Sequence, residues 1–230
     1  MCRILLIGGS DSSGGAGIQA DLRTVSALGG LGLTVLTGVT SQTDQKLVDL
    51  FALPTGLVQS QMKAAGAVDA IKVGALFTQT IVDVIERCIS DQPLVIDPVL
   101  SSTSGGTLLE KNALPTLKRL FARATLITPN LMEAAQLIGK PVESMERAGR
   151  QLLELGVQAV LIKGGHLSVP GIDCLVTSTK TTWFYGPPEK ALRGTGCILA
   201  SAIAVGLGQG LMIEQAVSKA KEYVKQCLMC

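Results

Sequence analysis

The chain contains 230 residues with a formal net charge of +2, and 47% of its residues are hydrophobic against 17% that are charged. This composition is typical of a soluble globular protein with a sizeable core, and it excludes an intrinsically disordered chain. The balanced charge and the lack of a dense Lys/Arg run argue against nucleic acid as a partner. The longest mostly apolar stretch, residues 198–207, is too short to span a bilayer, so we expect a cytoplasmic protein with no membrane partner.

Short apolar segments alternate with segments of helical periodicity along most of the chain. The predicted strands are residues 3–7, 33–39, 70–73, 94–97, 125–127 and 159–163. The predicted helices are residues 16–28, 55–65, 78–89, 108–121, 131–138 and 142–155. This alternation predicts βαβ units and a mostly parallel sheet that is covered by helices on both faces.

The last part of the chain departs from this alternation. Residues 174–185 predict two short strands with a turn near residues 178–180, followed by helices over 194–207 and 212–228. No linker divides the chain, so we expect one domain over residues 1–230. In parallel sheets, ligands bind beyond the carboxyl ends of the strands, so the chemistry is expected in the loops that follow them.

A glycine-rich segment from Gly8 to Gly17 follows the first predicted strand, which we expect to end near Ile7. Glycines let the backbone approach a ligand closely, because they lack a side chain and tolerate unusual dihedral angles. The segment has no Walker Gly-Lys-Ser/Thr, and residues 15–20 match a dinucleotide fingerprint only weakly, because they do not follow the strand directly. The alternative is a long structural turn with Ser13 as the helix N-cap.

The sequence Gly194-Thr195-Gly196-Cys197 opens a segment that is typical of a buried helix. Free N–H groups and the positive dipole end of a helix make its first turn an anion site. We expect the same turn to lower the pKa of Cys197, so that a thiolate could take a proton from a hydroxyl that attacks a phosphoryl group. The alternative is glycine packing beside an inert buried cysteine.

Polar residues end three other predicted strands. Asn130 and Glu133 match a capping box, but Glu133 could also organise Mg²⁺. Asp97 precedes a proline, which favours a turn and also allows a metal or phosphate role. Lys163 could meet a nucleotide phosphate as a point charge, whereas His166 is expected to be a solvated loop residue.

In their order and spacing, these motifs resemble the hydroxymethylpyrimidine and phosphomethylpyrimidine kinases of thiamine biosynthesis, within the ribokinase superfamily. The resemblance covers nearly the whole chain through residues 9–21, 71–74, 95–99, 126–134, 163–166 and 194–197. It implies a ribokinase-like three-layer α/β/α sandwich with a mostly parallel central sheet. It also implies ATP and Mg²⁺ as cofactors, a small-molecule substrate, and allows a homodimer.

The resemblance implies a role for each matching position. Gly194, Thr195 and Gly196 would form the anion hole, with Cys197 as the base. The metal and nucleotide positions would be Asn130, Glu133, Asp97 and Lys163. The substrate positions would be Gly9, Asp21, Gln42 and Val99.

Some positions depart from the family pattern. Arg193 replaces a common histidine and adds a charge beside the anion hole, whereas Ala75 replaces a methionine that borders the ring and should reshape that pocket. The Ala75 departure bears on the identity of the heterocycle more than on the reaction, whereas Arg193 could affect phosphate binding. The alternatives are a pyridoxal or pyridoxine kinase, a heterocycle-binding regulator without turnover, and an oxidoreductase that uses the first loop.

Overall fold

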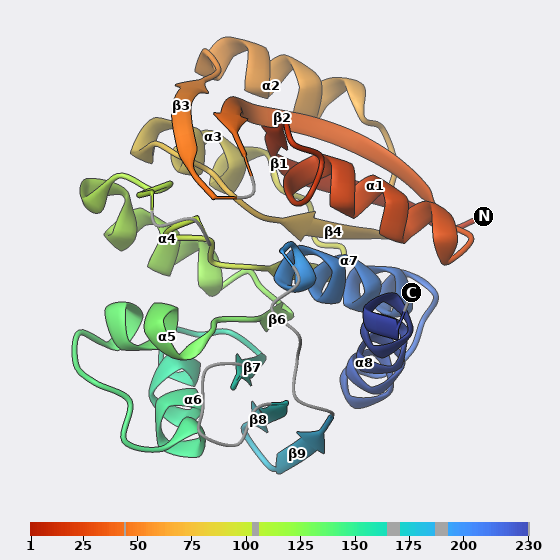
Figure 1. The fold of residues 1–230 in the computed structure, drawn as a ribbon, viewed down its shortest axis with the longest axis vertical. Coiled ribbons are helices and arrows are strands. Elements are labelled where there is room, and N and C mark those ends of the chain that lie inside the picture. Colours follow the sequence, from red (N-terminus) through yellow and green to blue (C-terminus); the bar gives the residue numbers. More distant parts are fainter. Residues whose placement is uncertain (44, 103–105, 165–170, 187–192, 230) are drawn as a thin grey trace.

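The computed structural model describes residues 1–43, 45–102, 106–164, 171–186 and 193–229. Its centre is a nine-stranded sheet in the order β3-β2-β1-β4-β5-β6-β7-β8-β9 (Figure 1). The strands are β1 (Arg3–Asp11), β2 (Leu31–Gln42), β3 (Leu47–Ala52), β4 (Ala70–Val73), β5 (Leu94–Ile96), β6 (Leu126–Ile127), β7 (Ala159–Lys163), β8 (Ile172–Thr177) and β9 (Thr181–Tyr185). From β2 to β7 in that order neighbouring strands run parallel, so their carboxyl ends share one edge of the sheet.

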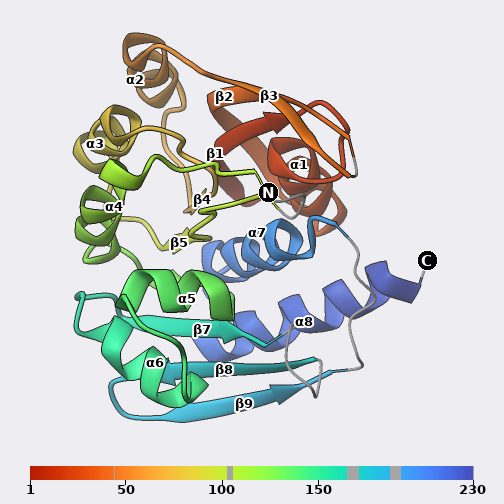
Figure 2. The same cartoon turned by 60° about the vertical axis from the view of Figure 1, so that its left-hand side comes forward.

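Helices cover both faces of the sheet (Figure 2). One face carries α2 (Thr55–Ala64), α3 (Gln79–Cys88), the short 3-10 helix η1 (Lys111–Ala113), α4 (Leu114–Phe121), α5 (Leu131–Ile138) and α6 (Met145–Leu153). The other face carries α1 (Gly17–Ala27), α7 (Thr195–Gly208) and α8 (Ile213–Met229). The three-layer α/β/α sandwich expected from the sequence is therefore confirmed.

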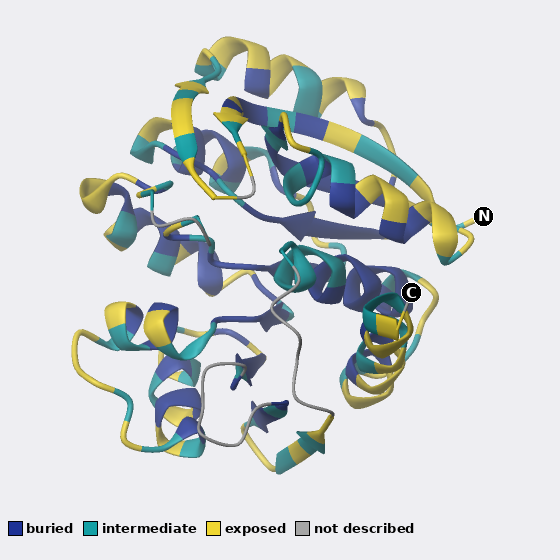
Figure 3. Cartoon of the chain, viewed as in Figure 1, coloured by how far each residue is buried: buried dark blue, intermediate teal, exposed yellow. Residues whose placement is uncertain are grey.

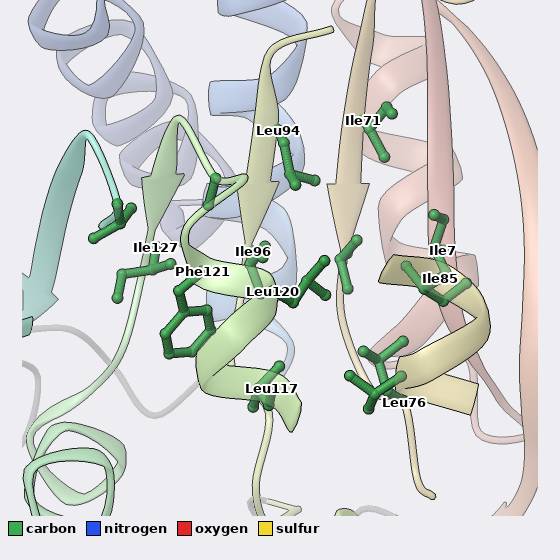
Figure 4. Close-up of a cluster of buried hydrophobic side chains, with 14 of the residues drawn as sticks. Ile7, Ile71, Leu76, Ile85, Leu94, Ile96, Leu117, Leu120, Phe121 and Ile127 are labelled. Carbon is green, nitrogen blue, oxygen red and sulfur yellow. The ribbon is translucent and has the colours of Figure 1, made fainter. Parts of the chain in front are cut away.

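The periodicity of the helices explains how they pack on the sheet. Leu117, Leu120 and Phe121 of α4 share one helix face and lie beside Ile85 of α3 over the central strands (Figure 4). The central strands are buried, whereas the edge strands and the outer faces of the covering helices are partly exposed (Figure 3). Apolar burial at about 25 cal/mol per Å² makes this core the main stabilising term.

Helix α7 is apolar on all sides and lies between the sheet and α8. Its residues from Leu199 to Leu207 are all buried. A helix of this kind is stable only inside a protein. Its position fixes the direction in which its first turn, with Gly196 and Cys197, meets the carboxyl edge of the sheet.

Several boundaries differ from the sequence predictions. β1 continues to Asp11 instead of ending near Ile7, because its last residues pair with β2 across a bulge. Helix α1 begins at Gly17 with Ala16 at the N-cap, so Ser13 is not the cap. The helix expected from residue 108 begins only at Leu114, with a proline in its first turn.

Strand β3 was not predicted. It pairs antiparallel with β2 at the edge of the sheet, and most of its side chains are at least partly exposed. The hairpin of β8 and β9 expected from the sequence is confirmed. Within the described ranges, no helix combines the length and the apolar character needed to cross a bilayer.

Candidate active site

The candidate site lies at the carboxyl edge of the sheet, where the strand order reverses. β1 is flanked by β2 on one side and by β4 on the other, so the strand order changes direction at β1, and we call the position beyond its carboxyl end the crevice. Ligands of open α/β sheets bind in such crevices. The first turn of α7 faces the same edge, because Gly196 lies against side chains that follow β5 and end β7.

An ion pair between Asp97 and Lys163 lies beneath the anion loop, which we define as residues 193–197. Lys163 Nζ donates to Asp97 Oδ1 at 2.8 Å, and Thr128 Oγ1 donates to the same oxygen at 3.0 Å. Burial would raise the pKa of Asp97, but Lys163 outweighs it and holds that pKa below its usual value. A Cβ at Gly196 would lie 3.1 Å from Lys163 Nζ, so the glycine keeps this cation close to the helix N-terminus.

Glu133 and Asn130 form the capping box that the sequence predicted. Asn130 Oδ1 accepts from the Glu133 N–H, and Glu133 Oε2 accepts from the Asn130 N–H, both at 2.8 Å. Burial raises the pKa of Glu133 to about 7. The Asp97 carboxylate adds to this rise, whereas the Lys163 ammonium opposes it. Among the described residues, no group of three or more His, Cys, Asp or Glu side chains could hold a metal ion. A cation here would therefore need further oxygens from a phosphate or water.

Cys197 lies in the first turn of α7, where its sulfur accepts a hydrogen bond from the Gly17 N–H. Burial outweighs the nearby Lys72 ammonium and raises the pKa of this thiol to about 11. The expectation of a lowered pKa is therefore wrong, because enclosure of the sulfur opposes the helix dipole. At neutral pH only about one thiol in ten thousand would be ionised at such a pKa.

Gln42 ends β2 at the other side of the crevice, near the loop that follows β1. The Gln42 side chain hydrogen-bonds to the Asp11 carboxylate. Its Oε1 is buried and has no hydrogen-bond partner among the described residues. A buried acceptor without a donor is costly, so this atom marks a place where a ligand donor would fit.

Asp21 does not face the crevice, which corrects its expected role as a substrate contact. The residue is fully buried, and both carboxylate oxygens accept from Lys72 Nζ, at 2.9 and 2.8 Å. Ser201 Oγ of α7 donates to Asp21 Oδ1 at 2.8 Å. Asp21 therefore ties α1 to β4 and α7 beneath the site.

Lys72 is the residue that the sequence analysis missed. It is buried in the middle of β4, and Asp21 outweighs the effect of burial and raises its pKa above the usual value. The signal was a lysine between Ile71 and Val73 in a strand that is otherwise apolar. A charge in that position needs a buried partner, which the sequence alone does not identify.

Phe77 occupies space next to the small residues at the substrate side. Its ring atoms lie 2.5 Å from a Cβ built at Gly9 and 2.6 Å from one built at Gly38. Phe77 has φ of 64°, which is unusual for a bulky residue. The ring therefore packs against β1 at Gly9 and against β2 at Gly38.

The remaining predicted residues are also located. Val99 follows Asp97 in the loop after β5 and is partly exposed, and its N–H donates to the Asp97 carbonyl. Thr195 begins α7. Gly165 and His166, which follow β7, lie outside the described residues.

A cavity of about 370 Å³ opens beside the anion loop, between the β8–β9 hairpin, α7 and α8. Lys163, Thr195 and Gly196 line its inner end, whereas Leu199 and Val224 provide apolar walls. Small-molecule sites are commonly of this size, with apolar walls and a few polar groups. The cavity therefore continues directly into the anion site.

Gly194→Ala is expected to destabilise the fold more than Gly210→Ala. Both glycines have φ of 84°, and a Cβ at Gly210 meets nothing within 4 Å, so that change carries only the left-handed backbone cost of about 1–2 kcal/mol. A Cβ at Gly194 would lie 2.1 Å from the Gly15 carbonyl oxygen and adds a clash. Urea unfolding of both variants measures the difference, and equal losses would contradict the close approach of the two loops.

The mostly parallel sheet with this strand order, and the helix N-terminus that faces its carboxyl edge, match the solved structures of small-molecule kinases of the ribokinase-like class. A family model described as phosphomethylpyrimidine kinase matches residues 11–230. The chain therefore belongs to the phosphomethylpyrimidine kinase family.

Individual relatives agree with this assignment. The chain is 41% identical to a hydroxymethylpyrimidine/phosphomethylpyrimidine kinase of Streptomyces coelicolor, over 96% of this chain and 86% of that protein. It is similar to the crystal structure of phosphomethylpyrimidine kinase from Clostridium difficile 630, with a TM-score of 0.87, 35% identity and 99% of each chain covered. It is also similar to the pyridoxal kinase of Staphylococcus aureus in complex with AMP-PCP and pyridoxal, with a TM-score of 0.88, 29% identity, and 99% and 88% covered.

Proposed function

We propose that the protein transfers a phosphoryl group from ATP to 4-amino-5-hydroxymethyl-2-methylpyrimidine, to its monophosphate, or to both, in thiamine biosynthesis. The observation that carries the proposal is the anion loop at the start of α7, held over the buried Asp97–Lys163 pair and open to a cavity on one side. Phosphoryl transfer depends mainly on positioning and on neutralising charge. This arrangement supplies both.

ATP is assigned to the cavity between the β8–β9 hairpin and α8. Apolar walls suit a nucleobase, and the inner end presents Lys163 and Gly196 to the phosphates. Lys225 also lines the cavity, whereas Lys221 in the same lining is paired with Asp173. The Staphylococcus aureus pyridoxal kinase, which has been solved with AMP-PCP, supports a nucleotide in this fold.

The pyrimidine is assigned to the crevice between Gly9, Gln42 and Val99. The 4-amino group of the ring would give the unpaired Gln42 Oε1 a hydrogen-bond donor. Glycine at position 9 lets the backbone approach the flat ring closely. Phe77 packs against Gly9 and gives the site a rigid base.

Mg²⁺ is assigned to oxygens of Asp97 and Glu133, with Asn130 holding the Glu133 carboxylate through the capping box. Carboxylate oxygens suit this hard cation, and ATP phosphates and water would complete its coordination. When bound, the ion would neutralise charge on the phosphates. Lys163 lowers the pKa of Asp97 and so favours the charged carboxylate that a cation requires.

Cys197 is assigned to the position beside the attacking hydroxyl, between the two ligand sites. The N–H groups of Gly194, Thr195 and Gly196 would hold the transferred phosphoryl group. As the substrate oxygen bonds to phosphorus, the bond between that phosphorus and the bridging oxygen of ATP breaks and ADP leaves. The substrate hydroxyl loses its proton in this step, and the sulfur of Cys197 is our candidate acceptor. Because the pKa of the thiol is about 11, the thiol must first give its own proton to solvent water.

The single-domain organisation over residues 1–230, a cytoplasmic location and a homodimer remain part of the same proposal. Two features support the single domain: one continuous sheet, and a family match that spans residues 11–230.

ATP consumption with Mg²⁺ tests the proposal against the pyrimidine, its monophosphate and pyridoxal. We expect turnover on the pyrimidine compounds, because the relative at 41% identity bears their name, whereas the pyridoxal kinase is 29% identical. Turnover on pyridoxal alone would keep the mechanism and change the substrate. Binding of a heterocycle without any turnover would favour the regulator instead, and tight nicotinamide dinucleotide binding would favour the oxidoreductase.

A further inference from the structure

Arg193 begins the anion loop, and its side chain reaches two other segments. Its Nη1 donates to Ser13 Oγ at 3.0 Å and to the Thr43 carbonyl at 2.7 Å, and its Nη2 pairs with Asp11 Oδ2 at 3.1 Å. Asp11 and Ser13 belong to the first loop, which we define as residues 11–17, whereas Thr43 follows β2. One guanidinium thus joins the phosphoryl side of the crevice to both segments on the heterocycle side.

Hydrogen bonds within the first loop hold the Asp11 carboxylate that pairs with Arg193. Its Oδ1 accepts from the N–H and the hydroxyl of Ser13, and its Oδ2 accepts from the Ala16 N–H at 2.8 Å. Burial would raise the pKa of Asp11, but these hydrogen bonds outweigh it and hold that pKa below the usual value. The charge that Arg193 brings beside the anion hole is therefore compensated by a fixed carboxylate.

The two loops are also in steric contact. A Cβ at Gly194 would lie 2.1 Å from the Gly15 carbonyl oxygen, and a Cβ at Gly15 would lie 3.6 Å from Cδ of Arg193. The first loop then donates the Gly17 N–H to the sulfur of Cys197. A change in the spacing of the loops would therefore reach the sulfur directly.

The Arg193–Asp11 pair is more enclosed than the ion pairs on the surface. The two side chains are 13% and 2% exposed, whereas those of Arg147 and Glu143 are 78% and 76% exposed. Surface pairs contribute little to stability, because water screens them and the side chains lose entropy. The enclosed Arg193–Asp11 pair is less screened, so it can hold the Arg193 guanidinium in one position relative to the first loop.

We propose that Arg193 is a positioning residue that fixes the spacing between the anion loop and the first loop, and thereby the distance between the two bound substrates. It acts through the loops and not by contact with the transferred phosphoryl group. The part of this inference that concerns kcat rests on the proposed function. Misplacement of reacting groups by about 1 Å can lower a rate by about a hundredfold, so loss of the Arg193 contacts is expected to lower kcat strongly.

The test compares Arg193→Met, Arg193→Lys, Asp11→Asn and the Arg193→Met/Asp11→Asn double variant in the full chain. Arg150→Met is the matched control, because Arg150 pairs with Glu146 and Thr181 away from the site. Two quantities are measured: kcat and KM for both substrates, and the rate at which iodoacetamide modifies Cys197, followed by mass spectrometry. Melting temperatures identify any variant that fails to fold.

We expect Arg193→Met to lower kcat by about tenfold or more, with little change in KM for ATP. Alkylation of Cys197 should rise by roughly threefold or more, because the sulfur is less enclosed. Arg193→Lys should be intermediate, since an ammonium cannot reproduce the fork of donors. The double variant should be no worse than the single changes, because both remove one interaction.

A folded Arg193→Met variant with unchanged kcat and unchanged Cys197 alkylation would overturn the inference. Fully additive losses in the double variant would do the same. If the unchanged protein shows no turnover on any pyrimidine, the proposed function fails, but the alkylation rates still decide whether Arg193 holds the two loops together.

Discussion

Cys197→Ala is expected to lower the kcat of pyrimidine phosphorylation by about a hundredfold or more, with ligand binding largely intact. The side chain lies between the anion hole and the first loop, so its loss removes the candidate proton acceptor without blocking either ligand site. Initial rates and equilibrium binding of both ligands measure the two effects separately. Near-normal turnover would remove Cys197 from the role of base.

Cys197→Ser separates proton acceptance from packing. A serine hydroxyl fills similar space but is much harder to deprotonate than a thiol, so it supplies far less anion to accept a proton, and a base role predicts a loss as large as with alanine. Recovery of most of the turnover with serine would instead indicate that the side chain only packs or donates a hydrogen bond.

The pH dependence of Cys197 alkylation should follow its raised pKa. The thiolate is the reactive form, and its fraction rises about tenfold for each pH unit below the pKa. With a pKa of about 11, the iodoacetamide rate should therefore still climb between pH 7 and pH 9 instead of levelling off. Cys197→Ala identifies the modified peptide, and a plateau near neutral pH would show that the thiol is acidic after all.

Lys72→Met is expected to destabilise the protein by about 3–5 kcal/mol, because it leaves the fully buried Asp21 carboxylate without its cation. Lys72 and Asp21 join β4 to α1, and Ser201 extends the contact to α7. Urea unfolding gives the free energy, and an unchanged m-value keeps the comparison valid.

Two further variants control this result. Lys72→Met combined with Asp21→Asn should recover part of the lost stability, because no charge is then buried alone. Lys180→Met breaks a surface pair with Glu214, whose side chains are 59% and 48% exposed, and should cost little. A loss in Lys72→Met no larger than in Lys180→Met would contradict the structural role of the buried pair.

The sequence was informative where local pattern sets structure. The apolar runs predicted all the central parallel strands, because strands buried on both faces are largely apolar. β3 was missed, since Asp49 interrupts its otherwise apolar run. Residues at strand ends, such as Asp97 and Lys163, were correctly expected at one edge, because parallel strands bring their carboxyl ends together.

Roles that depend on burial could not be obtained in this way. Asp21 lies in a motif that is typical of the family, yet its side chain turns inward to Lys72, fifty-one positions away. The pKa of Cys197 rises instead of falling, because the surrounding elements enclose the sulfur. Both outcomes depend on which segments pack together, and a local pattern carries no information about that.

By itself, the sequence determined the class of fold, the family and the edge of the sheet that carries the chemistry, since periodicity and motif order are local properties of the chain. Only the tertiary structure decided that Asp21 pairs with Lys72, that burial raises the pKa of Cys197, and that Arg193 binds Asp11 across 182 positions. The physical reason is that hydrogen bonds and desolvation act between neighbours in space. Those neighbours are fixed only when the sheet and its two helical layers are assembled.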